Sequence, residues 1–193
     1  ISISDINRDG CDDIYVSNDF RENDYLYINN CNGTFKESLE NYINHTSRFS
    51  MGNDISDINN DLYPDILVLD MLPEDEKVLK SSAGEDSYEI YKLKLEFGFN
   101  KQFTRNTFQL NNGNNSFSEI SQLMDIHATD WSWSTLVEDF DLDSYKDIYI
   151  TNGIVKRPND MDYINFISNE KLNYGLIQNP GLDNQDLLKE MPD

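Results

Sequence analysis

The residues of this chain best suited to chemistry are Asp and Asn side chains that recur at fixed spacing in three short segments. Each segment fits the pattern D-x-[DN]-x-D-x-x-x-D and runs directly into β-branched or aromatic residues, which are typical of strands. The segments cover residues 5–13, 57–65 and 139–147. Carboxylate and amide oxygens at this density suit a hard divalent cation, above all Ca²⁺, which takes roughly six to eight oxygen ligands.

The predicted ligands occupy positions 1, 3, 5, 7 and 9 of each segment. Side-chain oxygens at positions 1, 3, 5 and 9 would converge around a tight turn, and position 7 would supply its backbone carbonyl. The side-chain ligands are Asp5, Asn7, Asp9 and Asp13 in the first loop, Asp57, Asn59, Asp61 and Asp65 in the second, and Asp139, Asp141, Asp143 and Asp147 in the third; the carbonyl ligands are those of Cys11, Tyr63 and Tyr145. The expected cofactor is therefore Ca²⁺, with up to three ions in the chain.

Two alternatives compete with this interpretation. An EF-hand needs a Glu at position 12 and flanking helices, whereas position 12 is a Val or Ile inside a predicted strand in all three segments. Ordinary Asp/Asn turns, whose side chains bond their own backbone, are the second alternative, but four filled ligand positions in three loops favour metal. Position 6 of such a loop usually needs Gly, because the backbone has a positive φ there. It is Gly10 in the first loop, Leu62 in the second and Ser144 in the third. We therefore expect the second and third loops to bind calcium more weakly.

The strands that must position these loops form a sequence repeat. The stretch from Asp24 to Asp57 aligns without a gap with the stretch from Asn106 to Asp139. Each unit reads as an inner strand entering the loop, a second strand leaving it, a third strand, an Asn/Gly turn and a short fourth strand. Such units are typical of β-propeller blades, which cannot bury both faces alone. The predicted fold class is all-β, a partial β-propeller of about two and a half to three four-stranded blades with helical insertions.

The repeat divides the chain into three predicted parts. Blade 1 spans residues 1–50, and blade 2 spans residues 51–130 with a helical insertion at about residues 71–105. The third blade starts at residue 131 and continues into a second helical insertion over residues 153–193.

Capping residues mark the expected helices of the two insertions. Ser82 and Glu85 have the spacing of a capping box in the first insertion. In the second insertion we expect one helix to begin at Asn159 or Asp160 and another at Asp183.

The charge of the chain restricts its partners. It has 36 acidic residues against 15 basic ones, for a net charge of −21. Such a field repels phosphate backbones and anionic lipids, so we expect no nucleic acid partner and no direct membrane insertion. The apolar runs are also too short for a transmembrane helix.

Two pairs of residues have both a functional and a structural interpretation. His45 and His127 occupy equivalent repeat positions, which favours a repeated structural role over catalysis. Trp131 and Trp133 alternate along a predicted inner strand, where packing between blades is favoured over a sugar-stacking platform. The sequence contains no Ser/His/Asp, Cys/His or zinc-type spacing, so we predict that the chain is not an enzyme.

Cys11 lies in the first acidic loop and Cys31 in the Asn/Gly turn of the same blade. In a four-stranded meander these two tips share an edge but are about two strand spacings apart, roughly 10 Å. That separation exceeds the reach of a disulfide, so the unpaired state is favoured. A disulfide in an oxidising compartment stays as the alternative.

The loops and their surroundings resemble the FG-GAP/VCBS repeat family, and among its members the bacterial proteins similar to cartilage acidic protein that are associated with an ASPIC/UnbV segment. The resembling stretches are residues 29–35, 105–113, 129–133 and 145–153. The resemblance implies a β-propeller on a secreted or outer-membrane-anchored bacterial protein. The ASPIC/UnbV segment itself is absent from this sequence, so nothing attached to it is expected here.

We therefore expect a calcium-binding propeller segment of a larger secreted or cell-surface protein that acts as an interaction module. Its expected partner is a protein or glycan at the extracellular or outer-membrane surface. The alternatives are part of a polysaccharide-active enzyme and, by family analogy, an accessory subunit of an outer-membrane nutrient-uptake complex. Two carboxylates outside the metal loops that converge in a cleft would favour the enzyme.

Overall fold

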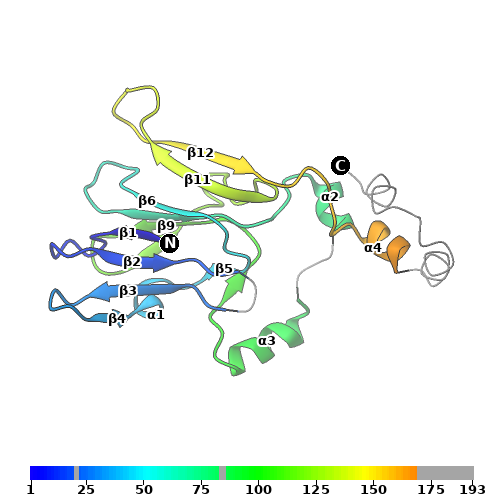
Figure 1. Ribbon diagram of the computed structural model, residues 1–193, viewed down its shortest axis with the longest axis horizontal. Coiled ribbons are helices and arrows are strands. Elements are labelled where there is room, and N and C mark those ends of the chain that lie inside the picture. Colours follow the sequence, from blue (N-terminus) through cyan, green and yellow to red (C-terminus); the bar gives the residue numbers. More distant parts are fainter. Residues whose placement is uncertain (20–21, 83–85, 169–193) are drawn as a thin grey trace, which may run out of the picture. The chain divides into compact units, whose positions relative to one another are not determined.

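The computed structural model describes residues 1–19, 22–82 and 86–168. The described residues within 1–72 and 86–153 form one compact unit, and residues 73–82 and 154–168 belong to a second. The first unit contains two four-stranded antiparallel sheets and a two-stranded hairpin (Figure 1). The predicted all-β class with short helices is thereby confirmed.

The first sheet is a simple meander of the strands β1 (Ser2–Ser4), β2 (Asp13–Val16), β3 (Tyr25–Asn29) and β4 (Phe35–Glu37). The segments that join these strands contain several Asp, Asn and Gly residues, which favour turns over extended pairing. The first acidic loop joins β1 to β2, so its two ends are fixed by the pairing of Ser4 with Asp13. A short helix, α1 (Leu39–Tyr42), follows the sheet.

The second sheet repeats this meander with the order β10-β9-β7-β6. Its strands are β6 (Asn53–Ser56), β7 (Asp65–Val68), β9 (Thr107–Asn111) and β10 (Phe117–Glu119). The second acidic loop joins β6 to β7, and the predicted insertion separates β7 from β9. A short parallel pair outside the repeat, β5 (Thr46–Ser47) with β8 (Gln102–Phe103), ties the end of the insertion to the chain before β6.

The third unit of the repeat is a hairpin of β11 (Ser132–Glu138) and β12 (Asp147–Asn152), with the third acidic loop at its tip. Within the described residues β12 pairs only with β11. The backbone of Trp133 approaches Gly52 so closely that a Cβ there would lie 2.5 Å from the Trp133 carbonyl oxygen. The Trp133 ring covers Gly153 of its own hairpin and is 47% exposed.

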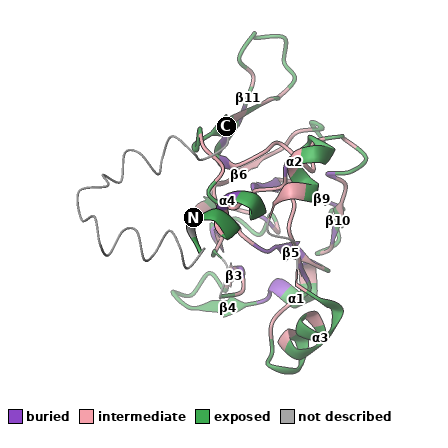
Figure 2. Ribbon diagram, turned by 90° about the vertical axis from the view of Figure 1, so that its right-hand side faces the viewer, coloured by how far each residue is buried: buried purple, intermediate pink, exposed green. Residues whose placement is uncertain are grey.

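Apolar side chains fill the space on both sides of the second sheet, because successive residues of a strand point to opposite faces. Ile66 and Val68 of β7 pack with Ile6 and Tyr15 of the first sheet. Leu67 of the same strand packs on the other face in a second cluster that includes Val137 of β11. The sheets therefore stack as blades do, and all residues of β7 are buried. Figure 2 shows buried segments among the strands around β6 and β9, while the loops and helices outside them are mostly exposed.

The outer face of the hairpin exposes the apolar side chains that the complete sheets bury. Tyr149 is 58% exposed and Phe140 is 54% exposed. The residues aligned with Tyr149 are Tyr15 and Leu67, which are each 1% exposed. The hairpin thus presents a blade face without a described neighbour.

The insertion helices begin at other residues than the sequence indicated. The predicted capping box at Ser82 is wrong, because Ser82 is the C-cap of α2 (Glu76–Ser81). Helix α3 (Tyr88–Glu96) begins instead after Ser87, whose side chain accepts a hydrogen bond from the Ile90 N–H. Asp86, one residue earlier, forms ion pairs with Arg48 and Lys94 at 2.9 and 2.5 Å, and the Arg48 pair ties the start of this helix to the segment that follows β5.

In the second insertion, α4 (Met161–Ile167) begins after Asp160, whose carboxylate accepts a hydrogen bond from the Tyr163 N–H at 2.9 Å. This confirms Asp160 as the N-cap among the two residues expected. Glu85 and the helix expected at Asp183 lie outside the described residues. Among the described helices, none has the length and apolar character needed to cross a bilayer.

Candidate metal centre

The three acidic loops have the same internal hydrogen bonds. The N–H of position 5 donates to one carboxylate oxygen of position 1 at 3.0 Å in every loop, and the N–H of position 6 donates to the other at 2.8–2.9 Å. The N–H of position 7 donates to the carboxylate of position 5 at 2.8–3.0 Å. The carboxylates at positions 1 and 5 therefore accept hydrogen bonds within their own loops, which join paired strands. Several predicted ligands are also exposed to solvent: Asp9, Asn59, Asp61, Asp141, Asp143 and Asp147.

Positions 4 and 6 of each loop adopt the left-handed conformation, which lets the chain turn tightly around its own carboxylates. At position 6 the φ values are +91° for Gly10, +74° for Leu62 and +76° for Ser144. The sequence rule that expects Gly at this position thus has a physical basis here. Leu62 and Ser144 hold a conformation that costs a residue with a Cβ about 1 kcal/mol or more.

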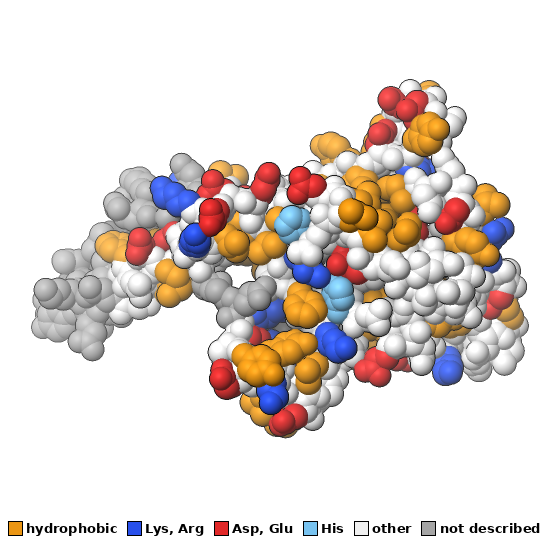
Figure 3. Space-filling view, turned by 180° about the vertical axis from the view of Figure 1, so that it is seen from behind, with side chains coloured by type: hydrophobic (Ala, Val, Ile, Leu, Met, Phe, Trp, Pro, Cys, Tyr) orange, Lys and Arg blue, Asp and Glu red, His pale blue; other side chains and the backbone are white. Residues whose placement is uncertain are grey.

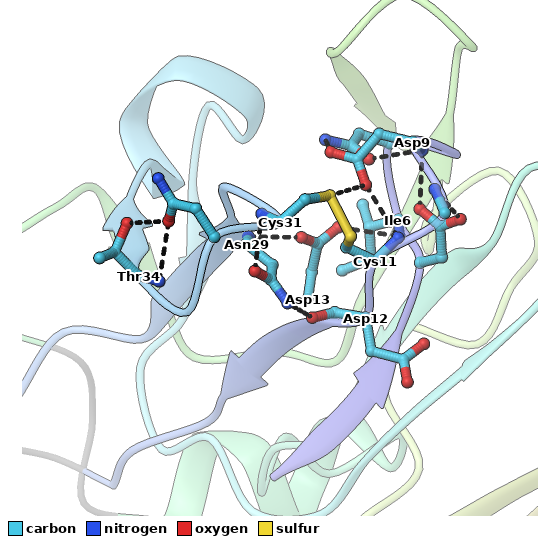
Figure 4. Close-up of a disulfide and its surroundings, with 12 residues drawn as sticks. Ile6, Asp9, Cys11, Asp12, Asp13, Asn29, Cys31 and Thr34 are labelled. Atoms are coloured by element: carbon cyan, nitrogen blue, oxygen red, sulfur yellow. Dashed lines mark hydrogen bonds between the residues drawn. A yellow bond between two sulfur atoms is a disulfide. The ribbon is translucent and has the colours of Figure 1, made fainter.

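The Asp at position 9 connects its loop to the sheet. The Asp13 carboxylate accepts from the Ile6 N–H at 3.0 Å and from the Asn29 N–H of β3 at 2.8 Å (Figure 4). Asp65 makes the equivalent pair of contacts, with the N–H groups of Ile58 at 3.1 Å and Asn111 of β9 at 2.8 Å. Both carboxylates are buried, at 0% and 1% exposure.

The third loop has only half of this connection. Asp147 accepts from the Phe140 N–H at 3.1 Å, but no described strand lies beyond β12 to supply the second donor. Its side chain is exposed.

Burial shifts the protonation of the position-9 carboxylates. It raises the pKa of Asp65 to about 6, against the lowering effect of the two N–H donors, and the nearby charges of Asp61 and Asp57 raise it further. The pKa of Asp13 is raised for the same first reason, with Asp9 contributing repulsion. A cation among these oxygens would favour the charged carboxylates that burial and repulsion disfavour.

Two Asn residues that sequence reasoning did not select hold the loops in place. The Asn29 side-chain amide donates to the Asp12 carbonyl at 3.0 Å, and that of Asn111 donates to the Pro64 carbonyl at 3.1 Å. These carbonyls belong to position 8 of the first and second loops. The equivalence of the two Asn residues in the repeat was the available signal, but it did not show that they reach back to the loops.

The structure overturns the expectation that Cys11 and Cys31 are unpaired. They form a disulfide with a Cα–Cα distance of 5.7 Å (Figure 4). The predicted separation was too large because it counted two strand spacings between the tips of the two hairpins. Cys11 lies two residues before β2 and Cys31 two residues after β3, and these are adjacent antiparallel strands only one spacing apart.

A non-covalent contact takes the place of this disulfide in the second sheet. The residues aligned with Cys11 and Cys31 are Tyr63 and Gly113. The Tyr63 ring lies against Gly113 so closely that a Cβ there would meet it at 2.9 Å. In both sheets, position 7 of the acidic loop is therefore braced by the turn after the third strand.

The loops also lie in a row at one end of the first unit (Figure 1). The Arg8 guanidinium of the first loop lies over the Tyr63 ring of the second, 5.2 Å from its centroid. The Asn60 amide of the second loop donates to the Ser144 carbonyl of the third at 3.1 Å. Figure 3 shows acidic side chains gathered at the projecting tip of the third loop.

The oxygen donors of the loops are of the type that calcium prefers, but among the described residues only the third loop brings three of its carboxylates within 4.8 Å of one another. In the third loop, one carboxylate oxygen from each of Asp139, Asp141 and Asp147 lies within 4.8 Å of the others. In the first two loops position 3 is Asn, and its amide donates to the position-5 carboxylate at 2.9 Å. A carboxylate oxygen can accept one N–H and still offer a lone pair to a cation, so the hydrogen bonds to backbone and a bound ion are compatible.

The fold and these loops agree with a comparison against protein families. Residues 5–68 match the model of the FG-GAP-like repeat. The FG-GAP-like repeat is a β-propeller element and generally a non-catalytic binding or structural module. The matched segment runs from the first predicted ligand, Asp5, to Val68 at the end of β7, so it contains the first two loops. A search of curated proteins found no match for the chain.

A second polar cluster of the blades lies at the opposite ends of their strands. Asp24, before β3, accepts hydrogen bonds from the Asn18 N–H at 2.8 Å, the Tyr15 hydroxyl at 2.7 Å and the Ser50 hydroxyl at 3.0 Å. Its aligned residue is Asn106, whose side chain accepts from the Asp70 N–H at 2.7 Å. Burial raises the pKa of Asp24 to about 6 despite these donors.

His45 belongs to an ionic cluster. Its Nε2 lies 3.3 Å from the Glu119 carboxylate and 3.1 Å from the Arg105 guanidinium, and its ring packs edge-on against Phe103. These contacts join the segment before β5 to the insertion and to β10. They describe a structural neighbourhood, with no hydroxyl or thiol nucleophile among the groups named.

Proposed function

We propose that this chain is a calcium-binding segment of a β-propeller protein, in which the ions stabilise the loops between the first and second strands of each blade. One observation supports this most directly. Three loops far apart in the sequence have the same backbone hydrogen bonds, the same left-handed positions, and Asp or Asn at all four side-chain ligand positions. A turn that needed only its own hydrogen bonds would not require four oxygen-bearing side chains on each occasion.

The role of the ions in this proposal is structural. Each loop crowds several carboxylates at one tip of a chain whose net charge is −21. Calcium bound there would offset their repulsion and bind only the folded loop, so it would shift the folding equilibrium toward the native state. The residues that would hold the ions are the fifteen predicted by the sequence, three of them through backbone carbonyls.

For the whole protein we propose an interaction module on a secreted or outer-membrane protein of a bacterium, within the ASPIC/UnbV-associated branch of the FG-GAP/VCBS family. A protein or glycan at the cell surface would be its partner, with an outer-membrane transport complex as one such setting. The disulfide supports an oxidising location, since such bonds persist chiefly outside the cytosol. The exposed blade face of the hairpin supports packing against further protein.

The enzymatic alternative finds no support in the cavity beside α1 and the end of α3. This cavity of about 240 Å³ is lined by residues including Glu40, His45 and Lys101, and Glu40 is the one carboxylate in its lining. A glycosidase would need a second carboxylate within about 5–10 Å. This cavity therefore gives no reason to prefer the enzyme to the interaction module.

Thermal unfolding with and without calcium tests the proposal. We expect the midpoint to rise when millimolar CaCl₂ is added to chelator-treated protein and to fall again with EDTA, while MgCl₂ at the same concentration has less effect because Mg²⁺ demands a tighter octahedral site. A thermal midpoint that EDTA leaves unchanged would contradict the proposal that calcium stabilises these loops.

A further inference from the structure

We propose that the Cys11–Cys31 disulfide sets the calcium affinity of the first loop, so that this one site responds to thiol reductants while the second and third do not. The inference rests on the proposed function, because it concerns how one predicted calcium loop is held. It adds a redox dependence that follows from the position of the disulfide.

The disulfide acts on a predicted ligand. Cys11 occupies position 7, whose backbone carbonyl is expected to bind the ion, and its N–H donates to the Asp9 carboxylate at 3.0 Å. The Cys31 sulfur lies 3.6 Å from the same carboxylate. The bond therefore fixes both the carbonyl of position 7 and the surroundings of the position-5 carboxylate (Figure 4).

The other loops have no covalent counterpart. Position 7 of the second loop is held by the Tyr63 ring against Gly113, which reductants do not affect. In the third loop position 7 is Tyr145, which is 67% exposed. The chain thus contains its own control, a loop with the same hydrogen bonds and a redox-insensitive brace.

The chemistry is a thiol–disulfide exchange. A dithiol reductant transfers two electrons and two protons, so the Cys11–Cys31 bond breaks, both residues become thiols and the reductant becomes a cyclic disulfide. Cys31 is exposed in the β3–β4 turn, so a reductant can reach it. With the bond broken, no covalent bond joins the turn to the loop, and the hydrogen bonds from Asn29 to the Asp13 carboxylate and the Asp12 carbonyl remain.

Binding and reduction must then be linked in both directions. If the disulfide strengthens calcium binding by some factor, bound calcium must make the disulfide harder to reduce by the same factor. We expect this factor to be about tenfold, within the usual range for such coupling.

The experiment isolates the first loop with Asp61→Ala and Asp143→Ala, which remove exposed ligands from the other two. Calcium affinity is measured by isothermal titration before and after reduction with dithiothreitol, and in the same chain with Cys11→Ser and Cys31→Ser. The matched control carries Asp9→Ala and Asp143→Ala, so that only the second loop binds. The fraction of disulfide in a dithiothreitol redox buffer is then compared with and without CaCl₂.

We expect reduction and the two Ser substitutions each to weaken calcium binding about tenfold in the first-loop chain, and reduction to leave the second-loop chain unchanged. Equal affinity in the oxidised and reduced first-loop chain would overturn this inference while leaving the calcium function intact. An equal loss of calcium affinity in the second-loop chain would overturn it too, because reduction would then destabilise the whole protein and not the first loop alone. Absence of calcium binding in every chain would refute the proposed function itself.

Discussion

The two complete blades and the β11–β12 hairpin contain the same acidic loop in different surroundings. In the blades, a third strand supplies an N–H to the position-9 Asp, an Asn amide to the position-8 carbonyl, and a turn that braces position 7. In the hairpin none of these contacts is present among the described residues, yet the hydrogen bonds inside the loop are the same. The loop conformation is therefore encoded locally, whereas its burial and rigidity come from the neighbouring strand.

The largest expected difference between these regions concerns the position-9 carboxylate. In EDTA, Asp65→Ala should lower the free energy of unfolding by about 3 kcal/mol, because two buried N–H groups lose their acceptor. Asp147→Ala, at the exposed equivalent, should lower it by about 1 kcal/mol or less. Urea denaturation of both variants measures the difference, and equal losses would mean that the third strand does not set the role of this residue.

The aromatic brace of the second loop gives the next largest effect. Gly113→Ala should lower the free energy of unfolding by about 2 kcal/mol, because the new Cβ is both at positive φ and against the Tyr63 ring. The matched control is Gly33→Ala in the first blade, where φ is +86° but no atom lies within 4 Å. For Gly33→Ala we expect the free energy of unfolding to fall by about 1 kcal/mol, from the backbone strain at positive φ alone.

The double variant Gly113→Ala with Tyr63→Ala separates the two causes. Removing the ring should recover the steric part of the loss and leave the backbone part. If Gly113→Ala and Gly33→Ala prove equally costly, Tyr63 does not press on the turn.

The pH dependence of stability should distinguish the first blade from the second, because Asp24 in one is Asn106 in the other. The folded pKa of Asp24 is raised from 3.8 to about 6 by burial, so the folded protein binds this proton more readily than the unfolded chain. Its contribution to stability is therefore greatest below about pH 4 and is lost as the pH rises through 6.

In EDTA we expect the thermal midpoint to rise as the pH falls from 7 toward 5, and Asp24→Asn to flatten that rise. A dependence of similar size should remain from Asp65, whose pKa is also raised to about 6, so the variant should flatten the profile only in part. If the Asp24→Asn variant keeps the full wild-type pH profile, Asp24 does not titrate in this range.

The smallest expected effect concerns position 6. Leu62→Gly should raise the free energy of unfolding by up to about 1 kcal/mol, since Gly relieves the positive φ of a 65%-exposed side chain. Gly10→Ala should produce a loss of similar size in the first loop. Differential scanning calorimetry of the pair checks the opposite signs, and a destabilised Leu62→Gly variant would contradict the strain argument.

The sequence predicted the strands and loops well because both follow local rules. The aligned repeat predicted four strands in each unit with an acidic loop between the first two, and both four-stranded sheets have this order. The blade boundaries and the metal ligands stay predictions, because nothing in the fold tests the occupancy of a loop.

Most of what sequence reasoning missed depends on contacts between distant residues. The start of α3 has a local N-cap in Ser87, which the prediction passed over in favour of Ser82, whereas the ion pair of the adjacent Asp86 with Arg48 joins residues far apart in the sequence. The disulfide depends on the pairing of β2 with β3, which places Cys11 and Cys31 at adjacent strand ends. The predicted Cys–Cys distance ignored this adjacency because it was taken between the tips of two hairpins. The contacts from Asn29 and Asn111 to the loops were invisible for the same reason.

A calorimetric calcium titration of the intact, chelator-treated chain tests the central claim most directly. We predict saturable binding of up to three ions, and a loss of one binding event in each of the variants Asp9→Ala, Asp61→Ala and Asp143→Ala. Binding that is undetectable at millimolar calcium, or that is the same in the three variants as in the wild type, would contradict the account.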